Sequence, residues 1–200
     1  REIKGRFADG ELEHLAVFGF APIPILMELG VLLSDLSAVS VYGRHREPKP
    51  GWAWPDDREP LEFKCVPGAL GPKKVALKLS VTAGINDERI ACALPEEPVS
   101  IWEIRSSRLG ASELRNKDDL SRFRELVGKT FDSIKDQHGM DVELSVFPAL
   151  PVPCAIEFGR TWQPKAHPPF LIYDQVPDRG FVLRHSVVRN PAYPHRDFDG

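Results

Sequence analysis

A sixteen-residue segment of this sequence occurs twice, and the second copy lies about 130 residues after the first. The first copy is LAVFGFAPIPILMELG at residues 15–30, and the second is LSVFPALPVPCAIEFG at residues 144–159. Two copies so far apart are too few for a solenoid or a propeller, so they predict two half-domains that face each other about an approximate twofold axis. Such a pair encloses one cleft between matching loops. Seven positions are identical: Leu15/Leu144, Val17/Val146, Phe18/Phe147, Pro22/Pro151, Pro24/Pro153, Glu28/Glu157 and Gly30/Gly159.

Each copy predicts the same local structure. A short apolar strand, at residues 15–18 or 142–147, stops at a proline-bearing turn, and a helix with prolines in its first turn follows. After a two-residue insertion in the second copy, residues 39–42 align with residues 170–173 as a second strand. A connection of this length makes the two strands parallel and places the helix on one face of the sheet. The predicted fold class is α/β, with two pseudo-twofold-related Rossmann-type halves of mainly parallel sheet fused in one compact domain.

A third unit of the same kind lies between the copies. It consists of a predicted strand at residues 75–82, a helix at 86–95 and a strand at 99–104. The longest predicted helix follows at residues 116–139, with its apolar positions on one face and a glycine at its end. This helix leads into the second copy.

The remaining segments set the expected boundaries. A last strand is expected at residues 181–188, and the polar tail at 190–200 should fray. The connection at residues 44–60 holds four prolines and two tryptophans, so we expect it to fold over a surface. The first half is expected at residues 1–111 and the second at 112–200.

Composition limits the class of protein. Hydrophobic residues make up 42% of the chain, and a net charge of -3 with a pI of about 6.1 gives no general basic surface for nucleic acid or an anionic membrane. No apolar run is long enough to span a membrane and no signal-peptide pattern occurs, so we expect a cytoplasmic protein. Cys65, Cys92 and Cys154 form no CxxC pair and predict core residues rather than a metal site or disulfides. A start at Arg1 suggests a fragment that lacks its effector domain.

Ligands of doubly wound α/β sheets collect outside the carboxyl ends of the strands. If the two halves face each other, the five loops that follow the carboxyl ends of the strands converge. Three of these loops lead into helices, whose free backbone N–H groups favour an anion. Prolines remove some of these donors, so side-chain cations must help. The sequence contains no GxGxxG or GxxxxGK[ST] fingerprint. The candidate ligand-binding residues are Phe20, Pro22, Arg44, His45, Trp52, Trp54, Thr82, Pro148, Ala149, Lys165, Tyr173 and Asp174.

Differences between the copies suggest roles for some of these residues. Tyr42 and Tyr173 end equivalent strands, where they could flank two flat rings or simply close the edge of the core. Arg44 and Lys165 could neutralise phosphates, and Asp174 could accept hydrogen bonds from a base edge such as that of guanine. A ligand of approximate twofold form would suit such a cleft with unequal ends.

Other residues favour structural or mixed roles. Of Trp52 and Trp54, we expect one to stack on a base and the other to anchor the long connection. Glu28 and Glu157 recur inside the helices, where a structural hydrogen bond is expected rather than catalysis. The six histidines are scattered without a carboxylate and a nucleophile nearby in sequence, so a hydrolytic triad is not supported.

Four stretches carry a family resemblance: VFGFAPIP at residues 17–24, VFPALPVP at 146–153, WQPK at 162–165 and PPFLIYDQ at 168–175. With them the chain resembles, over nearly its whole length, the SAVED sensor domain of bacterial anti-phage CBASS effectors. The resemblance implies two fused CARF-like units that bind a cyclic oligonucleotide made by a partner nucleotidyltransferase, a CD-NTase. The length is most similar to the SAVED region of the HNH-endonuclease-fused type, whose ligands are cyclic dinucleotides.

The resemblance implies a non-catalytic sensor. A cyclic di- or trinucleotide, with a cyclic dinucleotide such as cyclic GMP-AMP favoured, would drive self-association that activates a fused effector, expected to be a DNA endonuclease. No further cofactor, no metal, no membrane and no bound nucleic acid are expected for this domain. One alternative is a ring-nuclease-like phosphodiesterase that cleaves its ligand with Ser80, Thr82 and Lys165. Another is an assembly scaffold whose cleft is filled by its own side chains.

Overall fold

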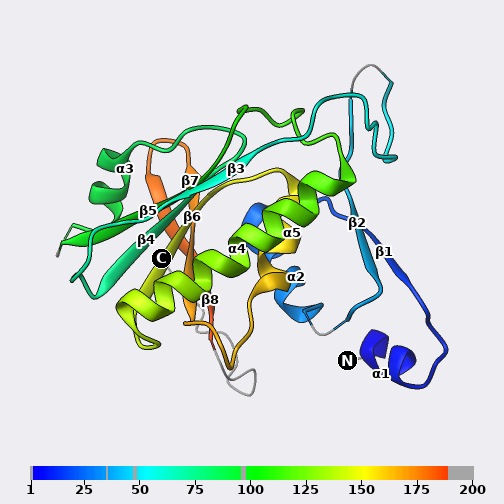
Figure 1. The fold of residues 1–200 in the computed structure, drawn as a ribbon, viewed down its shortest axis with the longest axis horizontal. Coiled ribbons are helices and arrows are strands. Elements are labelled where there is room, and N and C mark those ends of the chain that lie inside the picture. Colours follow the sequence, from blue (N-terminus) through cyan, green and yellow to red (C-terminus); the bar gives the residue numbers. More distant parts are fainter. Residues whose placement is uncertain (1, 35, 47–48, 96–97, 189–200) are drawn as a thin grey trace.

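The structure is a computed structural model that describes residues 2–34, 36–46, 49–95 and 98–188 (Figure 1). Every helix and strand predicted up to the last strand is present, and α1 and β3 are two elements that the sequence pattern did not predict. The expected fraying of the tail falls outside the described residues. In chain order the elements are α1 (Glu2–Ala8), β1 (Leu15–Phe18), α2 (Ile23–Leu32), β2 (Val39–Tyr42), β3 (Phe63–Val66), β4 (Lys74–Ser80), α3 (Asp87–Ala93), β5 (Val99–Ser106), α4 (Lys117–His138), β6 (Glu143–Ala149), α5 (Val152–Thr161), β7 (Phe170–Val176) and β8 (Gly180–Val187).

The strands form two sheets. β1 and β2 are a parallel pair, and the other six strands form one sheet in the order β3-β5-β4-β6-β7-β8. β4 runs parallel to β5 and β6, and β6 runs parallel to β7, whereas the edge strands β3 and β8 are antiparallel to their neighbours. The α/β class with mainly parallel sheets is therefore confirmed. Because β4 lies between β5 and β6, strands on both sides of residue 111 share one sheet, and the division into residues 1–111 and 112–200 stays a prediction.

Helices cover both faces of the larger sheet (Figure 1). On one face, α4 and α5 bury the main core, and the predicted apolar stripe of α4 is fully buried at Phe123, Phe131 and Ile134. On the other face, Ile90 of α3 packs with Phe147 in a second, smaller core. Within the described part of the chain, no helix combines the length and the apolar character that a membrane crossing requires.

Capping residues explain where the helices begin and end. The Asn86 side chain accepts a hydrogen bond from the Glu88 N–H (2.9 Å), which satisfies a free donor at the start of α3. At the start of α4, the Asp119 carboxylate accepts from the Asn116 N–H (3.4 Å). Gly139, with φ of 84°, ends α4 in a conformation that favours glycine. These caps explain why the sequence predicted both helix starts correctly.

The two repeats touch through α2 and α5, and the contact is reciprocal. A Cβ atom on Gly30 would overlap the carbonyl oxygen of Ile156 and lie 2.9 Å from the backbone nitrogen of Arg160. A Cβ atom on Gly159 would overlap the carbonyl oxygen of Met27 and lie 2.8 Å from the Val31 nitrogen. These contacts correspond, because Ile156 and Arg160 are the repeat equivalents of Met27 and Val31, 129 positions away. The predicted pseudo-twofold relation is thus present at the contact between the helices.

The repeated glutamates and the cysteines have structural surroundings. Glu157 pairs with Arg160 at 2.7 Å, and Glu28 lies 2.9 Å from the His185 Nε2, so both glutamates make the structural contacts expected of them. Cys154 is buried as predicted. Cys92 is exposed, which corrects the expectation of a core residue, because α3 turns only Ile90 into the core.

His167, which lies between α5 and β7, should make stability depend on pH. Its Nδ1 accepts a hydrogen bond from the Gln163 N–H (3.0 Å) and its ring stacks on Phe131. Burial lowers the pKa of His167 below the ordinary value of 6.5, although Asp132 opposes this. The unfolded chain therefore binds the proton more readily, and the free energy of unfolding should fall as the pH drops below about 6.5.

Urea unfolding at several pH values checks this expectation. His167→Asn keeps an acceptor near the Gln163 N–H but cannot titrate, so the dependence of unfolding free energy on pH should become shallower. An unchanged slope in the variant would contradict the assignment, whatever the absolute stability of the variant.

Candidate functional site

The matching loops of the two repeats meet at one edge of the molecule. The loop after β1 lies against the start of α5, since a Cβ atom on Gly19 would lie 2.9 Å from Val152 Cγ1. The loop after β2 reaches the same helix start, since a Cβ atom on Gly43 would lie 2.8 Å from Pro153 Cγ. Both glycines allow an approach that a side chain would hinder. We call the carboxyl ends of β1, β2, β4 and β6, with the loops that follow them, the shared edge.

The connections of the larger sheet diverge at the shared edge. From β4 the chain continues through α3 to β5 on one side, and from β6 it continues through α5 to β7 on the other. Open α/β sheets bind ligands at such a switch point. The Ala149 carbonyl, at the end of β6, accepts hydrogen bonds from the N–H groups of Val81 (3.1 Å) and Thr82 (2.8 Å). The predicted residues Thr82, Pro148 and Ala149 therefore lie together at this point.

Three predicted residues of the first repeat lie on the facing loops. Phe20 is 89% exposed in the loop after β1, and Pro22 is the residue that precedes the first turn of α2. Arg44, in the loop after β2, is exposed and has no ion-pair partner among the residues that the structure describes. The shared edge thus offers an apolar ring and a cation from one repeat beside the switch point of the other.

The long connection between β2 and β3 is folded, as predicted. His45 and Gly51 exchange two backbone hydrogen bonds, of 2.8 and 3.0 Å. Trp54 packs on the main core, and the Asp57 carboxylate pairs with the Arg115 guanidinium just before α4. Through Trp54 and Asp57, the second half of the connection is therefore tied to the body of the domain.

His45 is held inside this connection rather than presented to solvent. Its ring meets Trp54 edge-on at 6.0 Å between centroids, and its buried Nε2 has no hydrogen-bond partner among the described residues. Burial, together with the positive charge of Arg115, lowers the pKa of His45, while Asp57 opposes the shift. His45 is thus neutral near pH 7, and its role as a ligand contact stays a prediction.

The equivalent tyrosines stack on the equivalent phenylalanines. Tyr173 lies 4.7 Å from Phe147 between ring centroids, and Tyr42 lies 5.0 Å from Phe18. Tyr173 is only 8% exposed, and burial raises the pKa of its phenol. Side chains alternate along a strand, and the preceding residue, Ile172, packs in the main core with α5, so the Tyr173 ring points to the opposite face. The sequence allowed the two tyrosine rings to flank a ligand in a cleft between the repeats. The structure does not place them there.

The first repeat leaves its ring pair open. Phe18 is exposed, and Trp52 meets it edge-on at 5.2 Å between centroids. In the second repeat, the corresponding pair is covered by α3 and by Phe181 of β8. Trp54 is the tryptophan that anchors the connection, and Trp52 is the one that stays at the surface.

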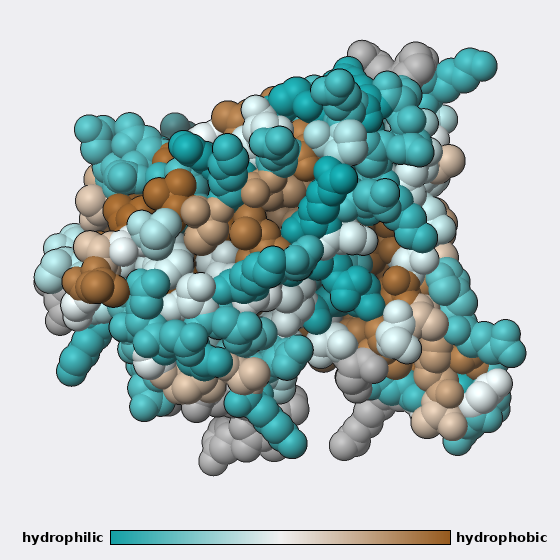
Figure 2. Space-filling view, in the orientation of Figure 1, coloured by the Kyte–Doolittle hydropathy of each residue, from teal (hydrophilic) through white to brown (hydrophobic). Residues whose placement is uncertain are grey.

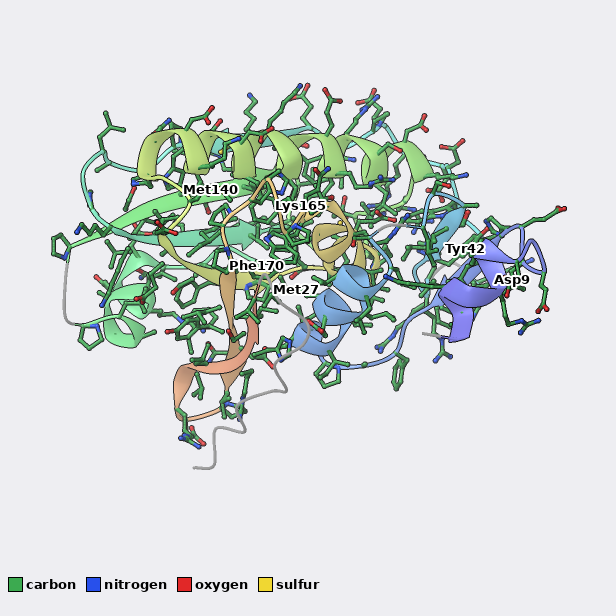
Figure 3. All side chains as sticks on the ribbon, turned by 90° about the horizontal axis from the view of Figure 1, so that it is seen from below. Asp9, Met27, Tyr42, Met140, Lys165 and Phe170 are labelled. Atoms are coloured by element: carbon green, nitrogen blue, oxygen red, sulfur yellow. The ribbon has the colours of Figure 1, made fainter. Side chains whose placement is uncertain are left out.

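Lys165 lies at the opposite edge from Ala149. It belongs to the connection between the end of α5 and the start of β7, and parallel strands begin at the edge away from their carboxyl ends. Figure 3 shows Lys165 beside α4 and well apart from Tyr42. The structure therefore does not bring Lys165 to Arg44. Asp174 lies toward the carboxyl end of β7, where its carboxylate accepts a hydrogen bond from the Gln175 N–H (2.9 Å).

The Ser80 hydroxyl, at the end of β4, is already engaged. Ser80 is buried, and its Oγ donates to the Glu103 carboxylate (2.6 Å), which lies 3.7 Å from the Lys78 Nζ. Over the described ranges, no three His, Cys, Asp or Glu side chains gather as a metal site would need. A groove of about 500 Å³ opens beside these groups, lined by Glu62, Lys64, Ser80, Gly84, Glu103, Arg105, Ser106, Ser107 and Leu109.

Several residues that shape the shared edge were not predicted from the sequence. Gly19 and Gly43 follow the two strands of the first repeat, and Val152 and Pro153 receive them at the start of α5. A glycine directly after a strand was the available signal, because close backbone approach needs a missing side chain. The contact itself joins residues more than 100 positions apart, which no local pattern reveals.

Sequence comparison places most of the chain in one family. The family model described as "SMODS-associated and fused to various effectors sensor domain", abbreviated SAVED, matches residues 1–182. No curated protein matches the chain by sequence.

Solved structures share the fold at low sequence identity. The Acinetobacter baumannii Cap4 SAVED/CARF-domain containing receptor with the cyclic trinucleotide 2'3'3'-cAAA superposes with a TM-score of 0.67 at 14% identity, over 92% of this chain and 41% of that chain. The same receptor without a named ligand gives a TM-score of 0.60 at 14% identity, over 86% of this chain and 36% of that chain. The receptor with 3'3'3'-cAAA gives a TM-score of 0.61 at 15% identity, over 82% of this chain and 36% of that chain. This chain thus spans well under half the length of these receptors.

Proposed function

The chain belongs to the SAVED family of sensor domains, and we propose that it senses a cyclic oligonucleotide, which binds at the shared edge. The observation that carries the proposal is the meeting of equivalent loops, where Gly19 and Gly43 of the first repeat lie against Val152 and Pro153 of the second. A site built by two equivalent loops suits a ligand that itself repeats a chemical unit. The Cap4 receptor, which shares the fold, has cyclic trinucleotides in two of its structures.

Charge and hydrogen-bond donors at the shared edge fit phosphodiesters. Arg44 is an exposed guanidinium without an intramolecular partner among the described residues, and guanidinium groups bind phosphate with two parallel hydrogen bonds. The Thr82 hydroxyl lies at the switch point, whereas its N–H is taken by Ala149. The exposed ring of Phe20 can stack on a base. Prolines in the first turns of α2 and α5 remove backbone donors, which leaves more of the phosphate binding to Arg44.

The ring size of the ligand is the open part of this proposal. The resemblance to HNH-fused effectors favours a cyclic dinucleotide such as cyclic GMP-AMP, whereas the Cap4 structures hold three-base rings. We keep the dinucleotide as the proposal. Titration calorimetry with cyclic di- and trinucleotides side by side decides between them, and an absence of heat with every ring would contradict the function itself.

Arg44→Ala should weaken binding of the ring that the panel identifies at least tenfold. A tenfold change in Kd corresponds to about 1.4 kcal/mol, which is within the range of one charge-assisted hydrogen bond. Lys165→Ala is the matched control, because it removes an exposed cation at the opposite edge and should leave Kd unchanged. Loss of affinity in the Lys165 variant alone would move the site to the other edge.

We also propose that ligand binding promotes self-association, which then activates a fused effector such as a DNA endonuclease. Light scattering with and without the bound ring should show a larger mass only with ligand. The domain itself is proposed to leave the ligand intact, since the buried Ser80 hydroxyl is committed to Glu103. Chromatography of the ligand after long incubation would reveal a linear product if the phosphodiesterase alternative holds.

A further inference from the structure

The structural repeat extends further back along the chain than the sequence match. The two repeats are offset by 129 residues, and the positions that correspond to α1 fall in the last two turns of α4. Both helices are followed by a glycine with positive φ. These glycines are Gly10, with φ of 73°, and Gly139, with φ of 84°. Each helix then leads through a short connection into the first strand of its repeat, β1 or β6. α1 therefore occupies the place along its repeat that the end of α4 occupies in the second repeat, although it does not pack on α2 as α4 packs on α5.

In the second repeat, two elements cover the surfaces that flank β6 and α5. β4 pairs in parallel with β6 on the edge away from β7, with Leu77 opposite Val146. α4 packs on the outer side of α5, where the Phe131 ring lies 5.2 Å from Phe158. Under this cover, Cys154 on the outer side of α5 is fully buried.

In the first repeat, none of the described residues covers the same two surfaces. Among the described residues β1 pairs with β2 alone, and the Leu15 N–H is directed to Ala38 (2.9 Å), so the N–H groups of Ala16 and Phe18 point to the free edge. Ile25, the counterpart of the buried Cys154, is 56% exposed. Figure 2 shows apolar side chains at the surface in the region of β1 and β2.

The composition of α2 also calls for cover. Its sequence IPILMELGVL is apolar apart from Glu28, which pairs with His185, and a helix that is apolar nearly all round is normally buried on most sides. One side packs on α5, but Ile25 and Leu32 on the other side stay more than half exposed. Parallel strands are also rarely left with an open edge, since an unpaired edge invites another strand.

We propose that the free edge of β1 and the outer side of α2 dock a strand and an amphipathic helix of the same protein, from polypeptide outside residues 1–200. The strand runs parallel to β1, as β4 does to β6. The helix lays an apolar stripe on Ile25 and Leu32, as α4 does on α5. The second repeat supplies the pattern for both elements, so the proposal does not depend on the ligand.

Hydrogen exchange in the full-length protein and in the 200-residue chain tests the docking. The Ala16 and Phe18 amides should exchange at least tenfold more slowly in the full-length protein, while the Leu15 amide, already bonded to Ala38, should change little. Equal exchange of Ala16 and Phe18 in the two proteins overturns the proposal. Protection that appears in the 200-residue chain as its concentration rises also overturns it, because a second copy would then be the occupant.

A charge introduced on α2 gives an independent readout. In the full-length protein, Ile25→Glu and Leu32→Glu should each lower the melting temperature by several degrees, because each buries a carboxylate under the docked helix. In the 200-residue chain, both should leave it nearly unchanged. Leu70→Glu is the matched control, since Leu70 is 73% exposed in the turn between β3 and β4 and should be neutral in both proteins. Neutral α2 variants in the full-length protein would contradict the docking.

Discussion

Gly159→Ala should destabilise the domain by about 3 kcal/mol or more, and Gly30→Ala should do the same. The added methyl group would overlap a backbone carbonyl of the facing helix, Met27 in one case and Ile156 in the other. A backbone atom cannot rotate away as a side chain can, so α2 and α5 must separate along their whole contact. Chemical unfolding of the two variants measures the loss directly.

Gly128→Ala is the control for this prediction. Gly128 lies inside α4, and its added Cβ atom would meet only the Thr161 Cγ2 at 3.6 Å, an ordinary contact. Alanine is preferred over glycine in a helix by about 0.5–1 kcal/mol, so this variant should be slightly more stable than the parent. If all three glycine variants behaved alike, the reciprocal crossing would not be what holds the repeats together.

Glu157→Leu should remove about 3–5 kcal/mol of stability, the usual result of breaking a buried ion pair from one side. Both Glu157 and Arg160 are buried, with 2.7 Å between Arg160 Nη1 and the carboxylate. Arg160 also donates to the Leu36 carbonyl (2.9 Å), in the segment between α2 and β2. Arg124 approaches the other carboxylate oxygen at 3.1 Å, as an ion pair without hydrogen-bond geometry. The leucine variant would leave the Arg160 charge buried with one carbonyl as its partner.

A double-mutant cycle separates the ion pair from simple packing. Glu157→Leu with Arg160→Met removes both charges and keeps similar volumes, so it should recover most of the stability that the single variant loses. Arg124→Ala removes only the partly exposed partner and should lose less than about 1 kcal/mol. A double variant as unstable as the sum of the two single variants would show that the pair does not act as a unit.

The sequence predicted the fold class and the repeat well because both depend on local periodicity. Caps at Asn86 and Asn116, prolines in the first turns and apolar alternation are signals carried by neighbouring residues. β3 escaped prediction because it is a four-residue edge strand that directly follows the proline-rich connection. Short edge strands carry few of the apolar positions on which such predictions depend.

The structure brings some of the predicted site residues together and separates others, and the separation has a topological cause. Thr82, Pro148 and Ala149 lie together because they end or follow strands that are neighbours in a parallel sheet. Lys165 was grouped with them because it lies in the insertion near Tyr173, but the insertion precedes β7 and therefore lies at the other edge. Sequence alignment of the repeats could not show which face of its strand Tyr173 occupies, because that depends on the cover supplied by α3.

The bonding of β4 to strands on both of its sides has a mechanical consequence. The unit β4-α3-β5 and the unit β6-α5-β7 are hydrogen-bonded into one continuous body, so neither can swing relative to the other without breaking a ladder. The first repeat has no such ladder to this body among the described residues and touches it through helix packing and loops. A ligand that draws the two repeats together would therefore rotate β1, α2 and β2 as one rigid unit about the crossing of α2 and α5.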